Sequence, residues 1–245
     1  MITALRSAIL VVLVLTSGQA GELILRNQGL GDGTLVLREQ VRRACIPLEK
    51  RQWLIDCDAS DAILSRMRVL LQDRKWNDLI EQFGADDFST WPADMADKAS
   101  EAFHLRGQAQ SFLKHGQPAE ADLKAALQLA PRNPALWLTR ADNYTNNLQD
   151  DEQALTAYRQ AFAITGKSNG WQPLTATVAI ARLLTDQVKT DGALAALKVY
   201  GDMEGMAPSW RIRLLRAYGH VYAAQGKEQE SLAKFREALE LESRQ

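Results

Sequence analysis

The second half of the chain repeats one short pattern of residues. The segments KAALQLAP (124–131), RQAFAITG (159–166) and REALELES (236–243) place an alanine and two large apolar residues at matching positions. From Ser100 onward, apolar residues recur at spacings of three and four, which is typical of α-helices with one buried face. Polar or glycine-containing turns divide these helices into pairs that recur about every 34 to 40 residues. This spacing predicts stacked helical hairpins, because one hairpin alone cannot bury its apolar face.

The last hairpin carries the most recognisable residues. Its first helix has Tyr218, Gly219 and Tyr222, and its second helix has Phe235 and Ala238. This order of aromatic, small and apolar residues resembles the tetratricopeptide repeat. Small residues are expected where two helices press together, and large residues fill the remaining gaps.

Three earlier hairpins match the same pattern to different degrees. Those that begin near Ser100 and Ala135 match at several positions, although Arg106 and Gln110 depart from the pattern and the second hairpin has one extra residue in its turn. The hairpin with Ala181 keeps the residue sizes but lacks the aromatic and glycine signals. An irregular helical bundle is the alternative, and three matching hairpins argue against it.

The resemblance implies an all-α fold, a helical-hairpin solenoid of the tetratricopeptide type with about four to five hairpins. We predict a repeat array over 100–245, preceded by a divergent hairpin and linker over 60–99. The segment 21–59 is irregular: ELILR is strand-like, and TLVLREQVRRAC is compatible with a helix.

The first twenty residues predict a secretory signal peptide over 1–20. Arg6 precedes an apolar run over 8–15, and small residues follow at Gly18 and Ala20. A membrane-spanning helix needs about 20 apolar residues, so the run is short for a permanent anchor. We expect an exported protein, periplasmic or extracellular, whose mature chain has no membrane span. A structural subunit held to the membrane by an uncleaved N-terminus is the alternative.

Cys45 and Cys57 are the only cysteines. Disulfides persist in exported proteins, so a bridge is possible between them. On one straight helix they would stand about 18 Å apart, too far for a bridge, but Pro47 interrupts such a helix. A bridge and two buried free thiols both remain open.

No pattern in the sequence predicts catalysis, a cofactor or a metal. The 29 basic and 30 acidic residues balance, which argues against bulk nucleic-acid binding. Gly29, Gly31 and Gly33 do not have the spacing of a dinucleotide-binding loop. The three histidines lack metal-ligand spacing. We therefore predict a protein that is not an enzyme; an enzyme with its active site in 21–59, using the repeats for docking, is the alternative.

In tetratricopeptide proteins the first helix of each hairpin lines a concave surface that binds a peptide or an extended segment of a partner. The resemblance assigns six candidate residues to this groove: Arg182, Arg213, Arg216, His220, Asp142 and Asn146. The arginines predict recognition of an acidic segment or a C-terminal carboxylate. The alternative is that they are solvated or paired with neighbouring acids.

Two leucines predict a further contact surface on the last helix. Leu232 and Leu239 are seven residues apart, so they share one stripe, and no hairpin follows them before Gln245. We predict that this stripe docks a second copy or a partner. Together these features predict an exported adaptor or assembly factor of the cell envelope, with no nucleic acid among its partners.

Overall fold

The structure is a computed structural model that describes residues 11–14, 24–27, 34–36, 57–201 and 205–244, with side chains from Ser60 onward. The described residues contain ten α-helices. The chain divides into two compact units, Met1–Pro131 and Arg132–Gln245.

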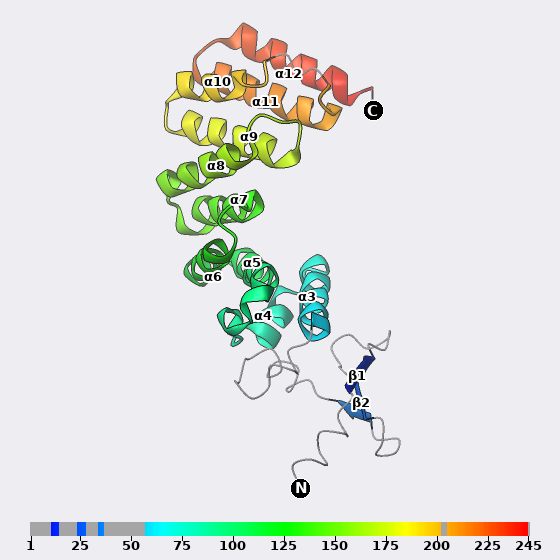
Figure 1. Cartoon of the computed structure of the whole chain (residues 1–245). Helices are drawn as coiled ribbons and strands as arrows, with labels where there is room; N and C mark the ends of the chain where they lie inside the picture. Colours follow the sequence, from blue (N-terminus) through cyan, green and yellow to red (C-terminus); the bar gives the residue numbers. More distant parts are fainter. Residues whose placement is uncertain (1–10, 15–23, 28–33, 37–56, 202–204, 245) are drawn as a thin grey trace. The chain divides into compact units, whose positions relative to one another are not determined.

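The described residues of the first unit form three short strands and two helical hairpins, and Figure 1 labels most of these elements. Helix α3 pairs with α4 in one hairpin and α5 with α6 in the next, and α3 also packs on α5. The segment between α4 and α5, where the sequence predicted a linker, contains two short 3₁₀ helices, which bury Phe88 and Met95. The elements are β1 (Val11–Val14), β2 (Ile24–Asn27), β3 (Thr34–Val36), α3 (Cys57–Gln72), α4 (Trp76–Phe83), η2 (Phe88–Thr90), η3 (Ala93–Met95), α5 (Ala96–Phe112) and α6 (Gly116–Leu129).

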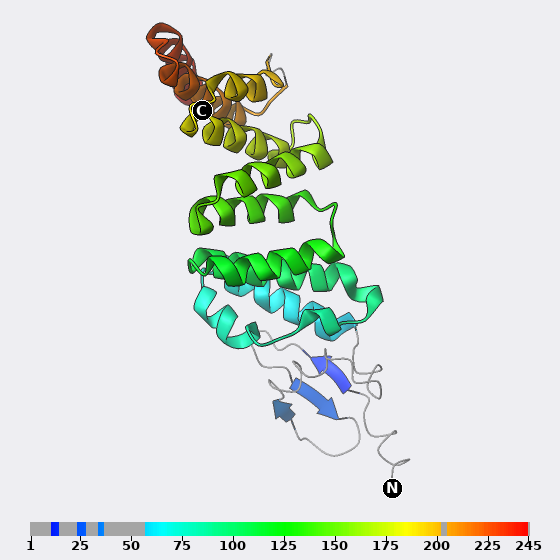
Figure 2. The same ribbon diagram turned by 90° about the vertical axis from the view of Figure 1, so that its left-hand side faces the viewer.

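The second unit is three helical hairpins. Figures 1 and 2 show its helices in consecutive layers, each beside the next. The first helices α7, α9 and α11 also contact one another in order. The elements are α7 (Pro134–Asn143), η4 (Tyr144–Leu148, a π-helical turn), α8 (Asp151–Thr165), α9 (Trp171–Asp186), α10 (Thr190–Lys198), α11 (Pro208–Ala224) and α12 (Glu228–Glu242). The predicted helical-hairpin solenoid is confirmed for the residues from Cys57 onward.

The strands form a small antiparallel sheet in the order β1-β2-β3. Leu25 pairs with Leu13 on one side and with Leu35 on the other. The strand-like segment ELILR is thus confirmed at Ile24–Asn27, whereas Thr34–Val36 is a strand where a helix was considered. Strand β1 lies inside the predicted signal peptide, so cleavage after Ala20 would leave only β2 and β3.

Residues at the helix starts explain where several helices begin. The Asn133 side chain accepts a hydrogen bond from the Ala135 N–H at 3.0 Å, and Pro134 occupies the first turn of α7. Pro208 likewise occupies the first turn of α11, although Ala207 before it makes no side-chain cap. Helix α9 begins at Trp171, and Pro173 is its third residue.

The five hairpin turns share one backbone geometry. In each turn one residue adopts a left-handed conformation, and the next N–H donates back to the end of the first helix. Only the last turn has glycine at the left-handed position. Val188 adopts the left-handed conformation although its side chain is β-branched and strongly exposed, and this conformation costs about 1 kcal/mol. These residues stand about 35 to 40 positions apart, which confirms five hairpins: Arg74, Lys114, Gln149, Val188 and Gly226.

Close helix contacts occur where the sequence has small residues. A Cβ atom on Gly219 would lie 2.8 Å from the Phe235 ring, and one on Gly107 would lie 3.1 Å from Leu123. Real Cβ atoms essentially never show the first of these distances, so only glycine fits there without a shift. The prediction that the second helix of each hairpin presses on these positions is confirmed.

The departure of Arg106 from the repeat pattern has a structural cause. Its buried guanidinium makes two hydrogen bonds to the Asp122 carboxylate, at 2.6 and 2.8 Å. It also donates to the backbone carbonyls of Phe83 and Asp86, at 2.9 and 2.5 Å, and lies 4.8 Å from the centre of the Phe88 ring. Arg106 therefore ties the segment after α4 to the α5–α6 hairpin.

Candidate binding surface

The six predicted groove residues all lie on, or directly after, the first helices of the second unit. Asp142 is on α7, Asn146 on the π-helical turn η4, and Arg182 on α9. Helix α11 carries the remaining three, and all six residues are exposed. We call this set the first-helix face: Asp142, Asn146, Arg182, Arg213, Arg216 and His220.

Asp142 is tied to a residue of the repeat pattern. The Tyr158 hydroxyl on α8 donates a short hydrogen bond to Asp142 Oδ1. Although Asp142 is exposed, its carboxyl group is partly shielded against Tyr158, and this burial raises the pKa of Asp142. The Tyr158 hydrogen bond and the charge of Arg182 oppose that rise. Asp142 therefore helps to hold α8 against α7 and places a negative charge near Arg182.

The three arginines differ in how far they are engaged. Arg213 is exposed and has its guanidinium 4.7 Å from the centre of the Trp210 ring, a cation–π contact. Arg216 forms an ion pair with Glu242 at 2.8 Å, and both side chains are about half exposed. Among the described residues neither Arg182 nor Arg213 has an ion-pair partner. Arg216 therefore fits the alternative of pairing with a neighbouring acid, and the binding role of Arg182 and Arg213 stays a prediction.

His220 and Asn146 complete the face in different ways. The imidazole ring of His220 meets the Phe235 ring edge-on, with 5.1 Å between ring centres, so it is oriented by α12. Asn146 lies in η4, where the π-helical turn accommodates the extra residue noticed in the sequence. Short π-helical segments are frequent at functional sites.

The leucine stripe of α12 is open to solvent. Leu232 is 55% exposed and Leu239 is 58% exposed, although both are large apolar residues. Their predicted exposure is confirmed, and what docks on them stays a prediction.

Several predicted features lie partly or wholly outside the described residues. Cys45 and the Cys57 side chain are among them, so the disulfide stays a prediction, as does most of the signal peptide. Within 57–201 and 205–244, no helix is long and apolar enough to cross a membrane. The described side chains also include no cluster of three or more histidine, cysteine or acidic residues that could hold a metal ion.

Comparisons with known proteins agree on the fold. No family model matches the chain, and no curated protein matches it. MamA from strain MSR-1 superposes with a TM-score of 0.54 at 15% identity, covering 76% of this chain and 97% of MamA. A Podospora anserina protein with nearly identical TPR-like repeats gives 0.61 at 16% identity, covering 75% and 94%.

YrrB, described as a TPR protein with an unusual peptide-binding site, gives a TM-score of 0.51 at 14% identity, covering 74% of this chain and 84% of YrrB. At such identities the likeness concerns the fold alone. The repeated residues, the five hairpins and these superpositions agree, and the chain has the tetratricopeptide-repeat fold.

Proposed function

We propose that the protein is an exported adaptor or assembly factor of the cell envelope that binds an acidic segment or C-terminus of another protein on its first-helix face. The observation that carries the proposal is the pair Arg182 and Arg213. Both are exposed, both lie on neighbouring first helices, and neither has an ion-pair partner among the described residues.

The chemistry of the two arginines suits a carboxylate ligand. A guanidinium group presents two parallel N–H donors to a carboxylate, which a lysine ammonium group does not. The Trp210 ring supports the Arg213 side chain and limits the conformational freedom that binding would remove. Asp142 disfavours a second acidic residue close to Arg182, so the ligand carries few negative charges there.

The fold supports a binding role, and the N-terminal residues support export. YrrB shares this fold and is described as having a peptide-binding site, which is a statement about YrrB. The alternative of an enzyme places its active site in 21–59, which lies mostly outside the described residues.

The test begins with crosslinking in the native envelope and identification of the captured protein. Binding is then measured for wild type, for Arg182→Glu with Arg213→Glu, and for the matched control Arg216→Glu. We expect the double variant to bind at least about ten-fold more weakly, because two attractive charges become repulsive. Arg216→Glu, a single change, should have a smaller effect, since Arg216 already donates to Glu242 and offers a ligand fewer free N–H donors. Equal binding by wild type and the double variant would contradict the proposal.

Export is tested on the same material by mass spectrometry. Loss of the first 20 residues from the envelope fraction would support the secreted form. An intact N-terminus in the membrane fraction would instead support the anchored structural subunit, and retention in the cytoplasm would contradict export.

A further inference from the structure

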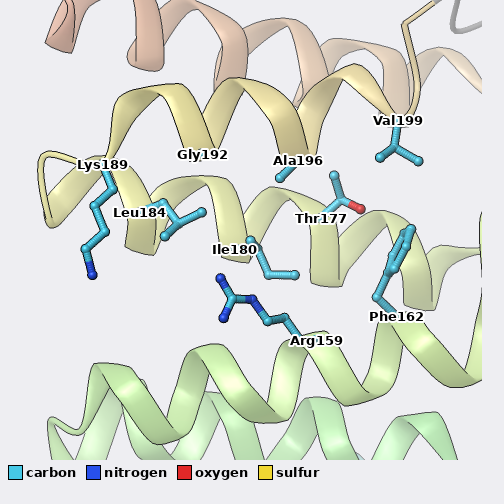
Figure 3. A pocket seen from close by; sticks show the side chains of 9 residues that line it. All are labelled: Arg159, Phe162, Thr177, Ile180, Leu184, Lys189, Gly192, Ala196 and Val199. Carbon is cyan, nitrogen blue, oxygen red and sulfur yellow. The ribbon is translucent and has the colours of Figure 1, made fainter.

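A groove lies between α8 and α10, the second helices of two neighbouring hairpins, on the side of α9 away from the first-helix face (Figure 3). Its volume is about 450 Å³, within the range of sites that hold small ligands or side chains. Residues of α9 form its floor, and α8 and α10 form its walls. We call it the second-helix groove, lined by Arg159, Phe162, Thr177, Ile180, Leu184, Lys189, Gly192, Ala196 and Val199.

The groove has an apolar end and a basic end. Figure 3 shows Phe162 and Val199 at one end, Lys189 at the other, and the Arg159 guanidinium between them beside Ile180. Four of the lining residues, Phe162, Ile180, Leu184 and Val199, have large apolar side chains, and no acidic residue lines the groove.

The two cations lack counter-charges within the described part of the chain. Arg159 is exposed and has no ion pair or hydrogen bond there. Lys189 contacts only the neutral Gln187 side chain, at 3.0 Å. A cation beside an apolar surface attracts a carboxylate whose apolar neighbour can be buried at the same time.

The α10 wall is low because its residues are small. Gly192 and Ala196 are four residues apart and therefore lie on one face of the helix. A Cβ atom on Gly192 would stand 3.5 Å from Leu184 Cδ1, an ordinary contact. Glycine is therefore not required there for packing within the hairpin. Because Gly192 is exposed and lines the groove, we expect a larger side chain at this position to extend into the groove.

We propose that the second-helix groove is a second peptide-binding site, for a segment of a partner protein that carries a bulky apolar side chain next to an acidic residue. The apolar side chain packs between Phe162 and Val199, and the carboxylate meets Arg159 and Lys189. Because Arg182 and Ile180 both belong to α9, this helix serves the first-helix face and the groove at once. The protein then holds two partner segments together, which goes beyond the proposed function.

The test uses the full protein and a phage-displayed library of random dodecapeptides. Selected peptides are synthesised and measured against four forms: wild type, Gly192→Leu, Gly192→Ala, and Arg159→Glu. Gly192→Leu fills the groove and Gly192→Ala leaves it open. Neither should lower the melting temperature, since both replace glycine in a helix.

We expect the library to yield acidic peptides with large apolar residues. Their affinity should fall at least about ten-fold with Gly192→Leu and about five-fold with Arg159→Glu, and change less than about two-fold with Gly192→Ala. The Arg182→Glu, Arg213→Glu variant should bind them like wild type, which separates this site from the first-helix face.

Three outcomes would overturn the proposal. Selected peptides that lose affinity only in the Arg182→Glu, Arg213→Glu variant would leave the first-helix face as the single site. Peptides that bind Gly192→Leu as tightly as wild type, or a selection without acidic apolar peptides, would show that the groove binds no such segment. A third outcome is self-association of the wild-type protein. If Gly192→Leu abolishes it, and the double variant Leu232→Gln, Leu239→Gln abolishes it too, then the groove binds a second copy of the chain.

Discussion

The α5–α6 hairpin and the α11–α12 hairpin have the same architecture, but different side-chain contacts hold their two helices together. Their patterns align with Gly107 on Gly219, so that Arg106 occupies the place of Tyr218. In the first hairpin a buried ion pair to Asp122 fills this place, and in the last a buried tyrosine does. The repeat fixes where two helices meet, while the groups that hold them can be charged or neutral.

The buried Arg106–Asp122 ion pair and the buried Tyr218 differ in whether they depend on a partner of opposite charge. A buried guanidinium needs its carboxylate, because an unpaired charge in a low-dielectric interior is strongly unfavourable. Tyr218 needs no counter-charge: burial, with the nearby Tyr222, raises its pKa to about 12, so it stays neutral at physiological pH.

The largest expected effect follows from removing the carboxylate. Asp122→Asn should destabilise the α5–α6 hairpin by about 3 to 5 kcal/mol, since Arg106 keeps its charge and loses its partner. Hydrogen exchange of the α5 and α6 amides measures this hairpin separately from the second unit. Replacing both residues, Arg106→Met with Asp122→Leu, should restore most of the protection. A loss below about 1 kcal/mol for Asp122→Asn would show that water already reaches the pair.

A smaller effect is expected at the close contact of the last hairpin. Gly219→Ala places a Cβ atom 2.8 Å from the Phe235 ring, so the ring or the helices must shift. We expect a net loss of about 1 to 3 kcal/mol by thermal or chemical unfolding, because overpacking outweighs the helix preference of alanine.

The first hairpin supplies the control for this change. Gly107→Ala meets Leu123 at 3.1 Å and should cost less. Adding Phe235→Leu to Gly219→Ala gives the last hairpin the side chain that the first one has, and should recover stability. If Gly219→Ala melts at the wild-type temperature, the Phe235 ring moves aside freely and the contact does not select glycine.

These hairpins also show what the sequence could predict. Gly107, Gly219 and the Asn133 cap follow from fixed positions in a repeat, so the fold and the first-helix face could be predicted. The Arg106–Asp122 pair could not, because it depends on which side chains meet across the register of two helices. The left-handed conformation of Val188 could not be predicted either, because the residue at this position of such a turn is usually glycine.

Side-chain packing also decided which candidate residues remain available. Arg182 and Arg213 form no ion pair with another described residue, whereas Glu242 engages Arg216 and Tyr158 engages Asp142. The second-helix groove was missed because Arg159 and Lys189 come from different helices with no common spacing. Its residues form a site only after α8 and α10 are placed on either side of α9.

The smallest effect on stability, and the largest on assembly, is expected for the leucine stripe. The position of Leu239 corresponds to Leu127 in the α5–α6 hairpin, which is only 7% exposed, whereas Leu239 is 58% exposed. A leucine buried by docking contributes about 1.5 to 3 kcal/mol, so the open stripe favours a second copy or a partner. Leu232→Gln with Leu239→Gln should leave the melting temperature within about 2 °C, since both side chains are already in water. Sedimentation velocity over a range of concentrations should then show loss of self-association, or of partner binding, while the control Leu232→Met with Leu239→Met keeps it. If wild type and the glutamine variant assemble and bind alike, the two leucines are ordinary exposed residues, and the α11–α12 hairpin differs from α5–α6 only in how it is closed.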